Sequence, residues 1–353
     1  MWPAGKNKQS LSAMKKEPTT LRDIAINLGV SISTVSRALS GAPEVNDQTK
    51  EAVLKAAKKL NYEPNHVAQS LRSNKTKTIG IIVPNLISHF FSATISGIQN
   101  MAAEKGYNVM ICQSNESFAT EVSNVQMMMS HRVDGLLISL SKETETYDHL
   151  HPILNRGIPL VFFDRVCEEL NTSRVMVDDH DGAFKATEHL IETGCRRIAH
   201  ISGPEQLSIS KNRRQGYLDA LQKHNIPVRE ELILHSSFKE EDVAVHTHTL
   251  LDLPNPPDAI FAVNDLVAVQ AMLVIKERGM KIPEDIAMVG FTNTPVSAFI
   301  EPSLTTVAQP AYQIGHISAK HILEQINHPQ DFIPQSIVLK TELIVRNSSR
   351  RKA

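Results

Sequence analysis

Four neighbouring residues, Ile32, Ser33, Ser36 and Arg37, combine small, polar and cationic side chains on one side of a predicted helix. Hydroxyl and guanidinium groups can hydrogen-bond base edges and phosphates, and an aliphatic side chain can contact a thymine methyl group. A helix that presents this mixture can enter a DNA major groove. The alternative interpretation is an ordinary helical hairpin whose polar face is only solvated.

Two short helices joined by a tight turn are predicted to position these side chains. The first has apolar residues at the i, i+3, i+4, i+7 spacing of one helix face: Leu21, Ile24, Ala25 and Leu28. Thr20 and Asp23 have the spacing of an N-terminal capping pair. Gly29 can adopt the left-handed conformation that ends this helix, and Ser31 can cap the next one. The second helix and a third, which opens at Asn46, have their own inward residues: Val35, Ala38, Leu39, Val53, Ala57 and Leu60.

The segment from Asn61 to Ser73 follows these helices. Pro64 suits the first turn of a further helix, but few apolar residues can anchor it. A short, poorly anchored helix is marginal in water, so we expect it to order only when DNA or a second copy of the chain supports it.

Three blocks in this order and spacing resemble the headpiece of the LacI/GalR family of bacterial transcriptional regulators: Thr20-Leu-Arg-Asp-Ile-Ala, Val30-Ser-Ile-Ser-Thr-Val-Ser-Arg37 and Asn61-Tyr-Glu-Pro-Asn-His-Val-Ala-Gln-Ser-Leu71. The resemblance implies that Ile32 and Ser33 read bases. It also implies that the phosphate backbone is held mainly by Thr20, Thr34, Ser36 and Arg37, the last of which can also reach a guanine edge.

The same resemblance places further DNA contacts in the hinge segment, at Asn65, His66, Leu71 and Arg72. Leu71 matches the family's hinge leucine, which pushes between base steps from the minor groove and kinks the duplex. Arg72 beside it is placed for a minor-groove or phosphate contact. The alternative for Leu71 is a packing residue of a short amphipathic helix.

Charge is distributed unevenly along a nearly neutral chain. Residues 1–77 hold 13 lysines and arginines against six acidic residues, so the remainder carries a net charge of −8. A basic end on an acidic body is expected where one end meets phosphate. The alternative, a solvated lysine-rich helix from Lys50 to Lys59, accounts for only part of this excess.

Composition excludes several classes of protein. Three cysteines without CxxC spacing argue against a disulfide framework or a zinc site, and they fit a reducing cytoplasm. The His246-Thr-His248 and Asp178–Asp181 stretches lack further ligands, so we expect surface polar residues and neither a metal nor a cofactor. No segment approaches a membrane span, and residues 1–17 read as a disordered extension without a signal peptide. Whether Met1–Ala13 is native or vector-derived is open.

Beyond Lys77, short apolar runs alternate with amphipathic helical segments. The predicted strands are 79–83, 108–112, 135–139, 160–163, 197–201, 259–263 and 286–290. This alternation argues for parallel sheets covered on both faces, and seven or more units argue for two doubly wound lobes. The expected fold is therefore an all-α helix-turn-helix headpiece with a hinge helix, followed by two α/β lobes.

This half also resembles the LacI/GalR family along its length, and behind it the periplasmic sugar-binding proteins. The matching motifs are Gly80-Ile-Ile-Val-Pro84, Arg132-Val-Asp-Gly-Leu-Leu137, Ile158-Pro-Leu-Val161, Gly203-Pro204, Asn264-Asp265 and Leu304-Thr-Thr-Val307. The resemblance implies a ligand cleft between lobes joined by crossovers near residues 178, 306 and 338. The expected divisions are headpiece 18–62, hinge 63–76, and effector-binding and dimerisation domain 77–353, with an N-lobe of about 77–177 and 307–337 and a C-lobe of about 178–306 and 338–353.

Ligands of parallel α/β lobes bind beyond the carboxyl ends of the strands. The effector-binding candidates at such positions are Phe90, Phe91, Asp164, Arg165, Arg213, Asn264, Asp265, Thr292 and Gln309. The phenylalanines could stack on a sugar ring, and the amides and carboxylates could bind hydroxyl groups. Core packing is the alternative for the phenylalanines, and a local ion pair is the alternative for Asp164 and Arg165.

Thr292 departs from the family pattern, which has an aspartate after Val289-Gly-Phe291. Losing that carboxylate while keeping Arg165 and Arg213 predicts a cleft tilted toward positive charge. An anionic or phosphorylated sugar, or a sugar acid, is the resulting hypothesis for the effector.

The expected function is a cytoplasmic, homodimeric DNA-binding regulator, most simply a repressor, whose affinity for a pseudo-palindromic operator depends on a small sugar-like effector. One alternative is a solute-binding protein without a transcriptional role. An enzyme is a second, but the sequence has no Gly-rich phosphate loop, no G-x-S-x-G and no metal-ligand cluster. Control by a phosphorylated carrier protein is a third, for which no residue argues.

Overall fold

The computed structural model describes residues 19–62, 75–330 and 332–351, and the chain divides into two compact units, Met1–Asn74 and Lys75–Ala353. In the first unit the described residues form three helices: α1 (Leu21–Leu28), α2 (Ile32–Leu39) and α3 (Asp47–Lys59).

The caps of these helices are where the sequence predicts them. Thr20 and Asp23 form a reciprocal capping box at the start of α1, and Gly29 ends that helix at φ 65°. The Ser31 hydroxyl accepts the Thr34 N–H at the start of α2, and the Asn46 amide oxygen accepts the Thr49 N–H at the start of α3. The apolar faces meet in a small core that includes Ile24, Val35, Ala38, Val53 and Ala57. The predicted helix-turn-helix is confirmed.

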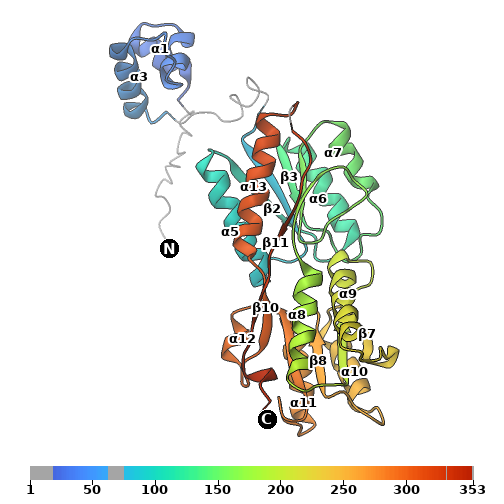
Figure 1. Cartoon of the computed structure of the whole chain (residues 1–353). Coiled ribbons are helices and arrows are strands. Elements are labelled where there is room, and N and C mark those ends of the chain that lie inside the picture. Colours follow the sequence, from blue (N-terminus) through green and yellow to red (C-terminus); the bar gives the residue numbers. More distant parts are fainter. Residues whose placement is uncertain (1–18, 63–74, 331, 352–353) are drawn as a thin grey trace, which may run out of the picture. The chain divides into compact units, whose positions relative to one another are not determined.

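The second unit contains two six-stranded sheets, one in each lobe (Figure 1). The N-lobe sheet has the order β11-β5-β4-β3-β1-β2, with all neighbours parallel. Its strands are β1 (Thr78–Val83), β2 (Asn108–Gln113), β3 (Gly135–Ile138), β4 (Leu160–Phe163), β5 (Ser173–Val177) and β11 (Ser336–Leu339). The C-lobe sheet has the order β12-β10-β9-β8-β6-β7, and only β12 is antiparallel to its neighbour. Its strands are β6 (Ile198–Ser202), β7 (Ile233–His235), β8 (Ala259–Ala262), β9 (Ala287–Thr292), β10 (Thr305–Ala308) and β12 (Glu342–Ile344).

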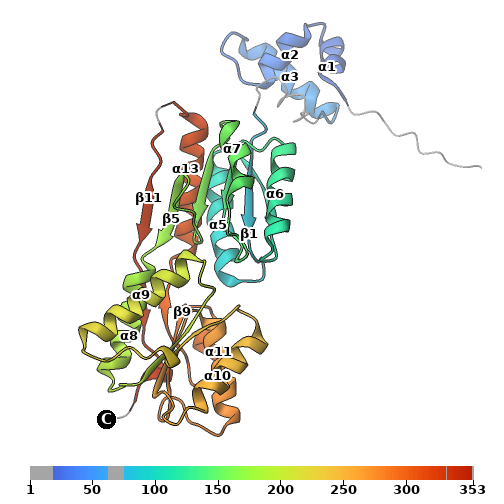
Figure 2. The ribbon, with the colours of Figure 1, turned by 90° about the vertical axis from the view of Figure 1, so that its right-hand side faces the viewer.

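Helices cover both faces of each sheet, so the central strands are buried on both sides. The N-lobe helices are α5 (His89–Glu104), α6 (Phe118–Ser130), η1 (Asp148–Leu150), α7 (His151–Asn155) and α13 (Ala311–Asn327). The C-lobe helices are α8 (Asp179–Glu192), α9 (Ser208–Lys223), η2 (Glu230–Leu232), α10 (Glu240–Leu251), α11 (Asp265–Glu277), α12 (Val296–Phe299) and η3 (Asn347–Ser349). In the C-lobe, α8 and α9 lie on one side of the sheet, and α10 and α11 lie on the other (Figure 2).

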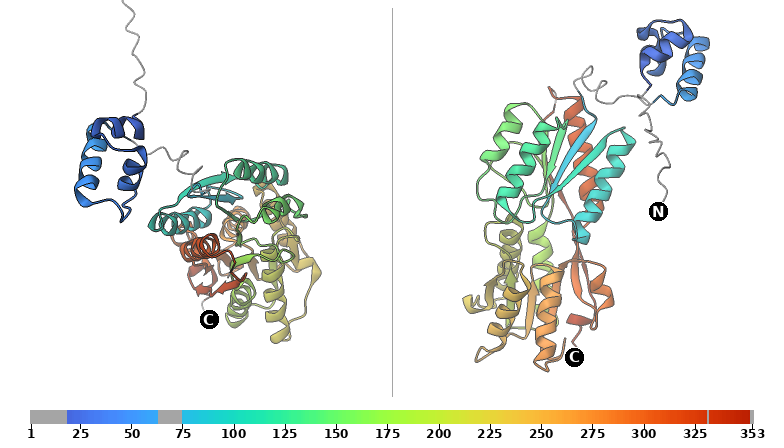
Figure 3. Two further views of the ribbon diagram at one scale, coloured as in Figure 1. Left: turned by 90° about the horizontal axis from the view of Figure 1, so that it is seen from above. Right: turned by 180° about the vertical axis from the view of Figure 1, so that it is seen from behind.

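Helices α5 and α13 pack side by side on one face of the N-lobe sheet (Figure 3). Two glycines allow this close approach. A Cβ atom on Gly315 would lie 1.9 Å from the Thr94 carbonyl oxygen, and one on Gly97 would lie 2.1 Å from the Tyr312 carbonyl oxygen. Both contacts would be with backbone atoms, which cannot move aside without separating the helices.

The chain crosses between the lobes three times: after Val177, after Ala308 and after Leu339. The first crossover is where the sequence predicts it. The second and third come slightly later than the predicted boundaries near 306 and 338, because β10 pairs with β9 through Ala308 and β11 pairs with β5 through Leu339. Across the described residues, no helix is long and apolar enough to cross a membrane.

Candidate functional site

The outward face of α2 carries the residues predicted to contact DNA. Ile32 is 48% exposed although it is aliphatic, Ser33 and Arg37 are exposed, and Thr34 and Ser36 are half-buried. The Ser31 hydroxyl lies 2.7 Å from the Ser33 hydroxyl and 2.8 Å from that of Thr34, so the cap fixes the first turn of the helix.

Thr20, at the start of α1, is exposed and its hydroxyl contacts the Asp23 carboxylate. The hinge residues predicted to contact DNA, Asn65, His66, Leu71 and Arg72, lie outside the described residues. Their roles stay predictions.

A cavity of about 280 Å³ lies between the two lobes of the second unit. All nine residues predicted to bind an effector line it, although they come from six separate segments, among them the helices α5 and α9. The other lining residues are Asn85, Ser88, Glu116, Lys142, Ile209, Ser237, Phe238, Leu266 and Thr294. The carboxyl ends of the parallel strands bring these segments together.

Arg213 is buried on α9 and already has a partner. Its Nε and one terminal nitrogen lie 2.8 and 2.7 Å from the Asp179 carboxylate at the start of α8, and its other terminal nitrogen donates to the Val263 carbonyl at 2.7 Å. The guanidinium carbon lies 3.8 Å from the centre of the Phe291 ring. These contacts fix the guanidinium and neutralise its charge.

Arg165, at the end of β4, is also paired. One terminal nitrogen lies 2.7 Å from Glu116 Oε2, and the guanidinium carbon lies 5.7 Å from the centre of the Phe238 ring. Its Nε is buried and has no hydrogen-bond partner among the described residues. Its hydrogen bonds to described residues use only one terminal nitrogen, so Nε and the other terminal nitrogen retain N–H donors.

Asp164 has the least satisfied carboxylate in the cavity. It is only 8% exposed, and its side chain makes no hydrogen bond to any described residue. Burial raises the pKa of Asp164 to about 6, although the charges of Arg165 and Arg213 oppose that shift. A buried acceptor without a donor costs free energy that a ligand hydroxyl can recover.

Asp265 lines the cavity, and its carboxylate is held by several hydrogen bonds within the protein. It accepts hydrogen bonds from the Thr294 N–H at 2.7 Å, the Thr294 hydroxyl at 3.0 Å and the Ser297 hydroxyl at 2.7 Å, and it also contacts the Thr306 hydroxyl. Three of these bonds are to Oδ2 and only the Thr306 hydroxyl contacts Oδ1, so Oδ1 keeps an acceptor position. The side chain holds the loop after β9 in place, and its role as a ligand contact stays a prediction.

Asn264 and Gln309 keep donors for the cavity. The Asn264 oxygen caps α11 by accepting the Val267 N–H at 2.9 Å, which leaves the amide N–H groups for a ligand. Gln309 Nε2 is buried without a partner among the described residues. Phe90 and Phe91 are buried in contact with each other, edge to face at 5.2 Å, and both line the cavity. Phe90 and Phe91 therefore pack in the core, as the alternative interpretation predicts, and they also line the cavity.

Strained backbone gathers around the cavity. The lining residues Glu116, Asp164, Phe238 and Thr292 all have φ between 61° and 125°, a region that L residues rarely adopt. The β-branched Thr292, at φ 125°, is the most unusual of them. Such conformations persist where the surroundings impose them, and they cluster at ligand sites.

The cavity is electrostatically balanced. Three cationic residues line it, Lys142, Arg165 and Arg213, and so do three acidic ones, Glu116, Asp164 and Asp265. Because Glu116 and Asp179 each lie 2.7 Å from an arginine, the predicted positive tilt is wrong. The sequence reasoning considered Asp164 as a partner for Arg165 and missed these two carboxylates, which are 49 and 34 residues away along the chain.

Sequence reasoning also missed Glu116, Lys142 and Phe238 as cavity residues. Glu116 and Lys142 follow β2 and β3, which were predicted as strands, so the strand-end rule would have found them. Phe238 follows β7, a strand of three residues that gives no clear apolar run.

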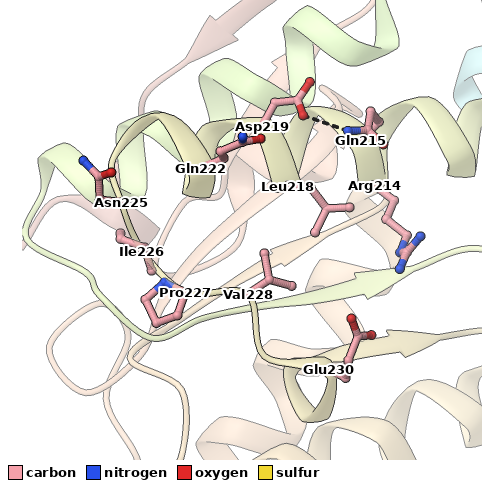
Figure 4. Close-up of a pocket in the computed structure, with 10 residues that line it drawn as sticks. All are labelled: Arg214, Gln215, Leu218, Asp219, Gln222, Asn225, Ile226, Pro227, Val228 and Glu230. Atoms are coloured by element: carbon pink, nitrogen blue, oxygen red, sulfur yellow. Dashed lines mark hydrogen bonds between the residues drawn. The ribbon is translucent and has the colours of Figure 1, made fainter.

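A second hollow, of about 590 Å³, lies on the outer side of α9 (Figure 4). Its lining consists of Arg214, Gln215, Leu218, Asp219, Gln222, Asn225, Ile226, Pro227, Val228 and Glu230. The Asp219 carboxylate in this hollow accepts a hydrogen bond from the Gln215 side-chain amide at 2.7 Å and lies 2.7 Å from His180 Nε2. It contains none of the residues at the carboxyl strand ends that surround the interlobe cavity.

A helix-turn-helix body followed by a two-lobed unit with an interlobe cavity defines a DNA-binding transcriptional regulator. Residues 20–65 match the model of bacterial regulatory proteins of the lacI family, and residues 187–349 match the periplasmic binding protein-like domain. The HTH-type transcriptional repressor CytR of Escherichia coli K12 is 34% identical over 341 residues, which cover 96% of this chain and 99% of that protein. The ribose operon repressor of Halalkalibacterium halodurans is 34% identical, with coverages of 94% and 97%.

Solved structures agree with this assignment. The Lac repressor dimer bound to operator and the anti-inducer ONPF has a TM-score of 0.83 at 26% identity, covering 94% of this chain and 99% of that one. The transcriptional regulator CelR in complex with cellobiose has a TM-score of 0.71 at 31% identity, with the same coverages. The chain belongs to the LacI family of bacterial transcriptional regulators, as the sequence blocks predict.

Proposed function

We propose that this regulator is a homodimeric repressor of the cytoplasm whose operator affinity is set by a small, neutral, hydroxylated molecule bound between the lobes. The buried Asp164 carboxylate, which has no donor among the described residues, carries this proposal for the ligand. The relatives are named as repressors, which supports repression and assigns no catalytic reaction.

The unsatisfied groups define what the ligand must offer. Asp164 needs a hydroxyl or N–H donor, while the Gln309 amide and Arg165 Nε need acceptors. A hydroxyl group is both donor and acceptor, so a polyol or sugar ring can satisfy all three. Phe90 and Phe91 supply apolar surface for the ring. An added anionic group would find both arginines already paired, and it would lie near the Glu116 and Asp164 carboxylates.

Exposed apolar residues around the cavity support a dimer. Ile87 is 92% exposed in the loop between Asn85 and Ser88, two residues that line the cavity. Leu266 also lines the cavity yet is half exposed, and Phe299 on nearby α12 is 85% exposed. Exposed large apolar side chains are candidates for interaction surfaces. A second copy of the chain would bury such side chains in a two-fold dimer, and a two-fold dimer matches a pseudo-palindromic operator.

Ligand control follows if the two lobes close around the ligand. Closure then changes how the two headpieces of the dimer are presented to DNA, so that ligand binding and operator binding affect each other reciprocally.

Two experiments test the function separately. Selection of fragments from genomic DNA by the full chain should enrich an inverted repeat, and enrichment without any repeat would contradict the operator proposal. Calorimetric titration with D-ribose, cellobiose and a nucleoside should find a neutral ligand that binds. D-ribose 5-phosphate and D-glucuronate are the matched anionic probes, and tight binding of these alone would overturn the neutral class.

A further inference from the structure

Lys142 lies in the N-lobe loop after β3, yet it contacts two loops of the C-lobe. Its Nζ donates to the Ser237 carbonyl at 2.9 Å, in the loop between β7 and α10. Its own carbonyl accepts from the Gln206 side-chain amide, in the loop between β6 and α9. We propose that Lys142 is an interlobe latch that positions the C-lobe wall of the cavity.

The latch is connected to the cavity through Glu116. The Lys142 N–H donates to Glu116 Oε2 at 2.9 Å, and the same oxygen accepts from Arg165 at 2.7 Å. On the other side of the latch, Ser237 precedes Phe238, whose ring lies over the Arg165 guanidinium. The latch therefore joins Arg165, which retains N–H donors in the cavity, to the loop whose Phe238 ring lies over it.

The topology explains why this place is sensitive to closure. The crossovers reach the C-lobe at β10 and β12, which form one edge of its sheet, and through α8, which contacts both. Gln206 and Ser237 follow β6 and β7, which form the opposite edge. Opening about the crossovers thus moves the β6–β7 edge furthest.

The size of this movement can be estimated from the strand spacing. Four steps separate β10 from β7 in the sheet order. At about 4.8 Å a step the lever is ~19 Å long, so a rotation of ~10° moves its end by ~3 Å. That displacement breaks a hydrogen bond of 2.9 Å. The latch is made only near the closed arrangement, and it stabilises that arrangement relative to open ones.

Hydrogen exchange of the full chain without ligand tests the latch. Lys142→Met keeps the apolar stem and removes the donor, and it should speed amide exchange in residues 236–243 about tenfold, the factor for one lost hydrogen bond to a charged donor. Lys142→Arg restores a donor and should exchange like the wild type. Lys185→Met is the matched control, because Lys185 pairs with Asp181 on the same helix at 2.6 Å and contacts no other lobe.

A local role would look different. If Lys142→Met alters exchange only in its own loop, residues 140–146, or nowhere, the latch is refuted. Gln206→Ala tests the contact from the C-lobe side and should speed amide exchange in residues 140–146. This second variant keeps the test decisive if Lys142→Met lowers the stability of the whole unit. Unchanged exchange there would also refute the latch. The consequence for ligand affinity rests on the proposed function, but this experiment contains no ligand, so its failure would leave the ligand assignment untouched.

Discussion

His200 on β6 makes the stability of the C-lobe depend on pH. Its ring is fully buried, stacked on Tyr217 at 5.2 Å and on Phe261 at 4.8 Å. Nδ1 donates to the Phe261 carbonyl at 2.9 Å, and Nε2 has no partner among the described residues. Burial lowers the pKa of His200 to about 3. The folded protein therefore holds this imidazole neutral throughout the physiological range.

The direction of the effect follows from linkage. Below the ordinary histidine pKa of about 6.5, the unfolded chain binds a proton that the folded chain refuses, so stability falls as the pH falls. At about 1.4 kcal/mol for each pH unit beyond 6.5, the loss between pH 7 and pH 5 is ~2 kcal/mol. The loss would level off only near the folded pKa of about 3.

Urea unfolding of wild type and His200→Gln at pH 7 and pH 5 isolates this contribution. Glutamine can still donate to the Phe261 carbonyl but does not titrate, so every other titrating group cancels in the difference between the two proteins. We expect His200→Gln to be the less stable protein at pH 7 and its deficit to shrink by ~2 kcal/mol at pH 5. A deficit that is the same at both pH values would refute the reasoning.

Three further predictions concern other sites. Gly315→Ala should lower the free energy of unfolding of the second unit by about 1–3 kcal/mol, measured in urea, because the new Cβ atom would collide with the Thr94 carbonyl oxygen. The control Ser96→Ala, on the exposed face of α5, should leave that free energy nearly unchanged. The affinity of the wild type for a neutral ligand should fall about tenfold between pH 7.5 and pH 5, because Asp164 becomes protonated. Asp164→Asn should bind that ligand weakly at both pH values. If calorimetry finds the same wild-type affinity at both pH values, the carboxylate is not the acceptor. Arg37→Ala should weaken operator binding and reduce the slope of log affinity against log salt by about 1 in gel-shift titrations, and an unchanged slope would remove Arg37 from the phosphate contacts.

Local rules were enough to predict the headpiece and most of the sheets. The capping pair of Thr20 and Asp23 and the turn at Gly29 depend on residues a few positions apart, and the structure confirms both. The seven predicted strands are all present, and six of them are interior strands, which are continuous apolar runs; the seventh, β2, lies at an edge. The five strands that were not predicted, β5, β7, β10, β11 and β12, lie at or next to a sheet edge, and each has only three to five residues.

The cavity shows the limit of such rules. The strand-end rule and, for Arg213 within α9, the family resemblance placed nine residues at one cavity, because both follow the topology. The electrostatics depends on which side chains meet across the fold, and there the predicted net positive charge was wrong and the hydrogen bonds that hold Asp265 were not predicted. Neither the hydroxyls around Asp265 nor the carboxylate partners of Arg165 and Arg213 are close in sequence.

The third crossover has a consequence for how the protein is made. Strands β11 and β12, Ser336–Leu339 and Glu342–Ile344, give each lobe an edge strand from the last part of the chain. The N-lobe sheet is complete only after residue 339 has been synthesised and the C-lobe sheet only after residue 344, whereas the headpiece helices end at Lys59. At roughly 5–20 residues per second the delay is about 15–60 s. During that interval each nascent chain presents a folded DNA-reading surface that no ligand can yet control.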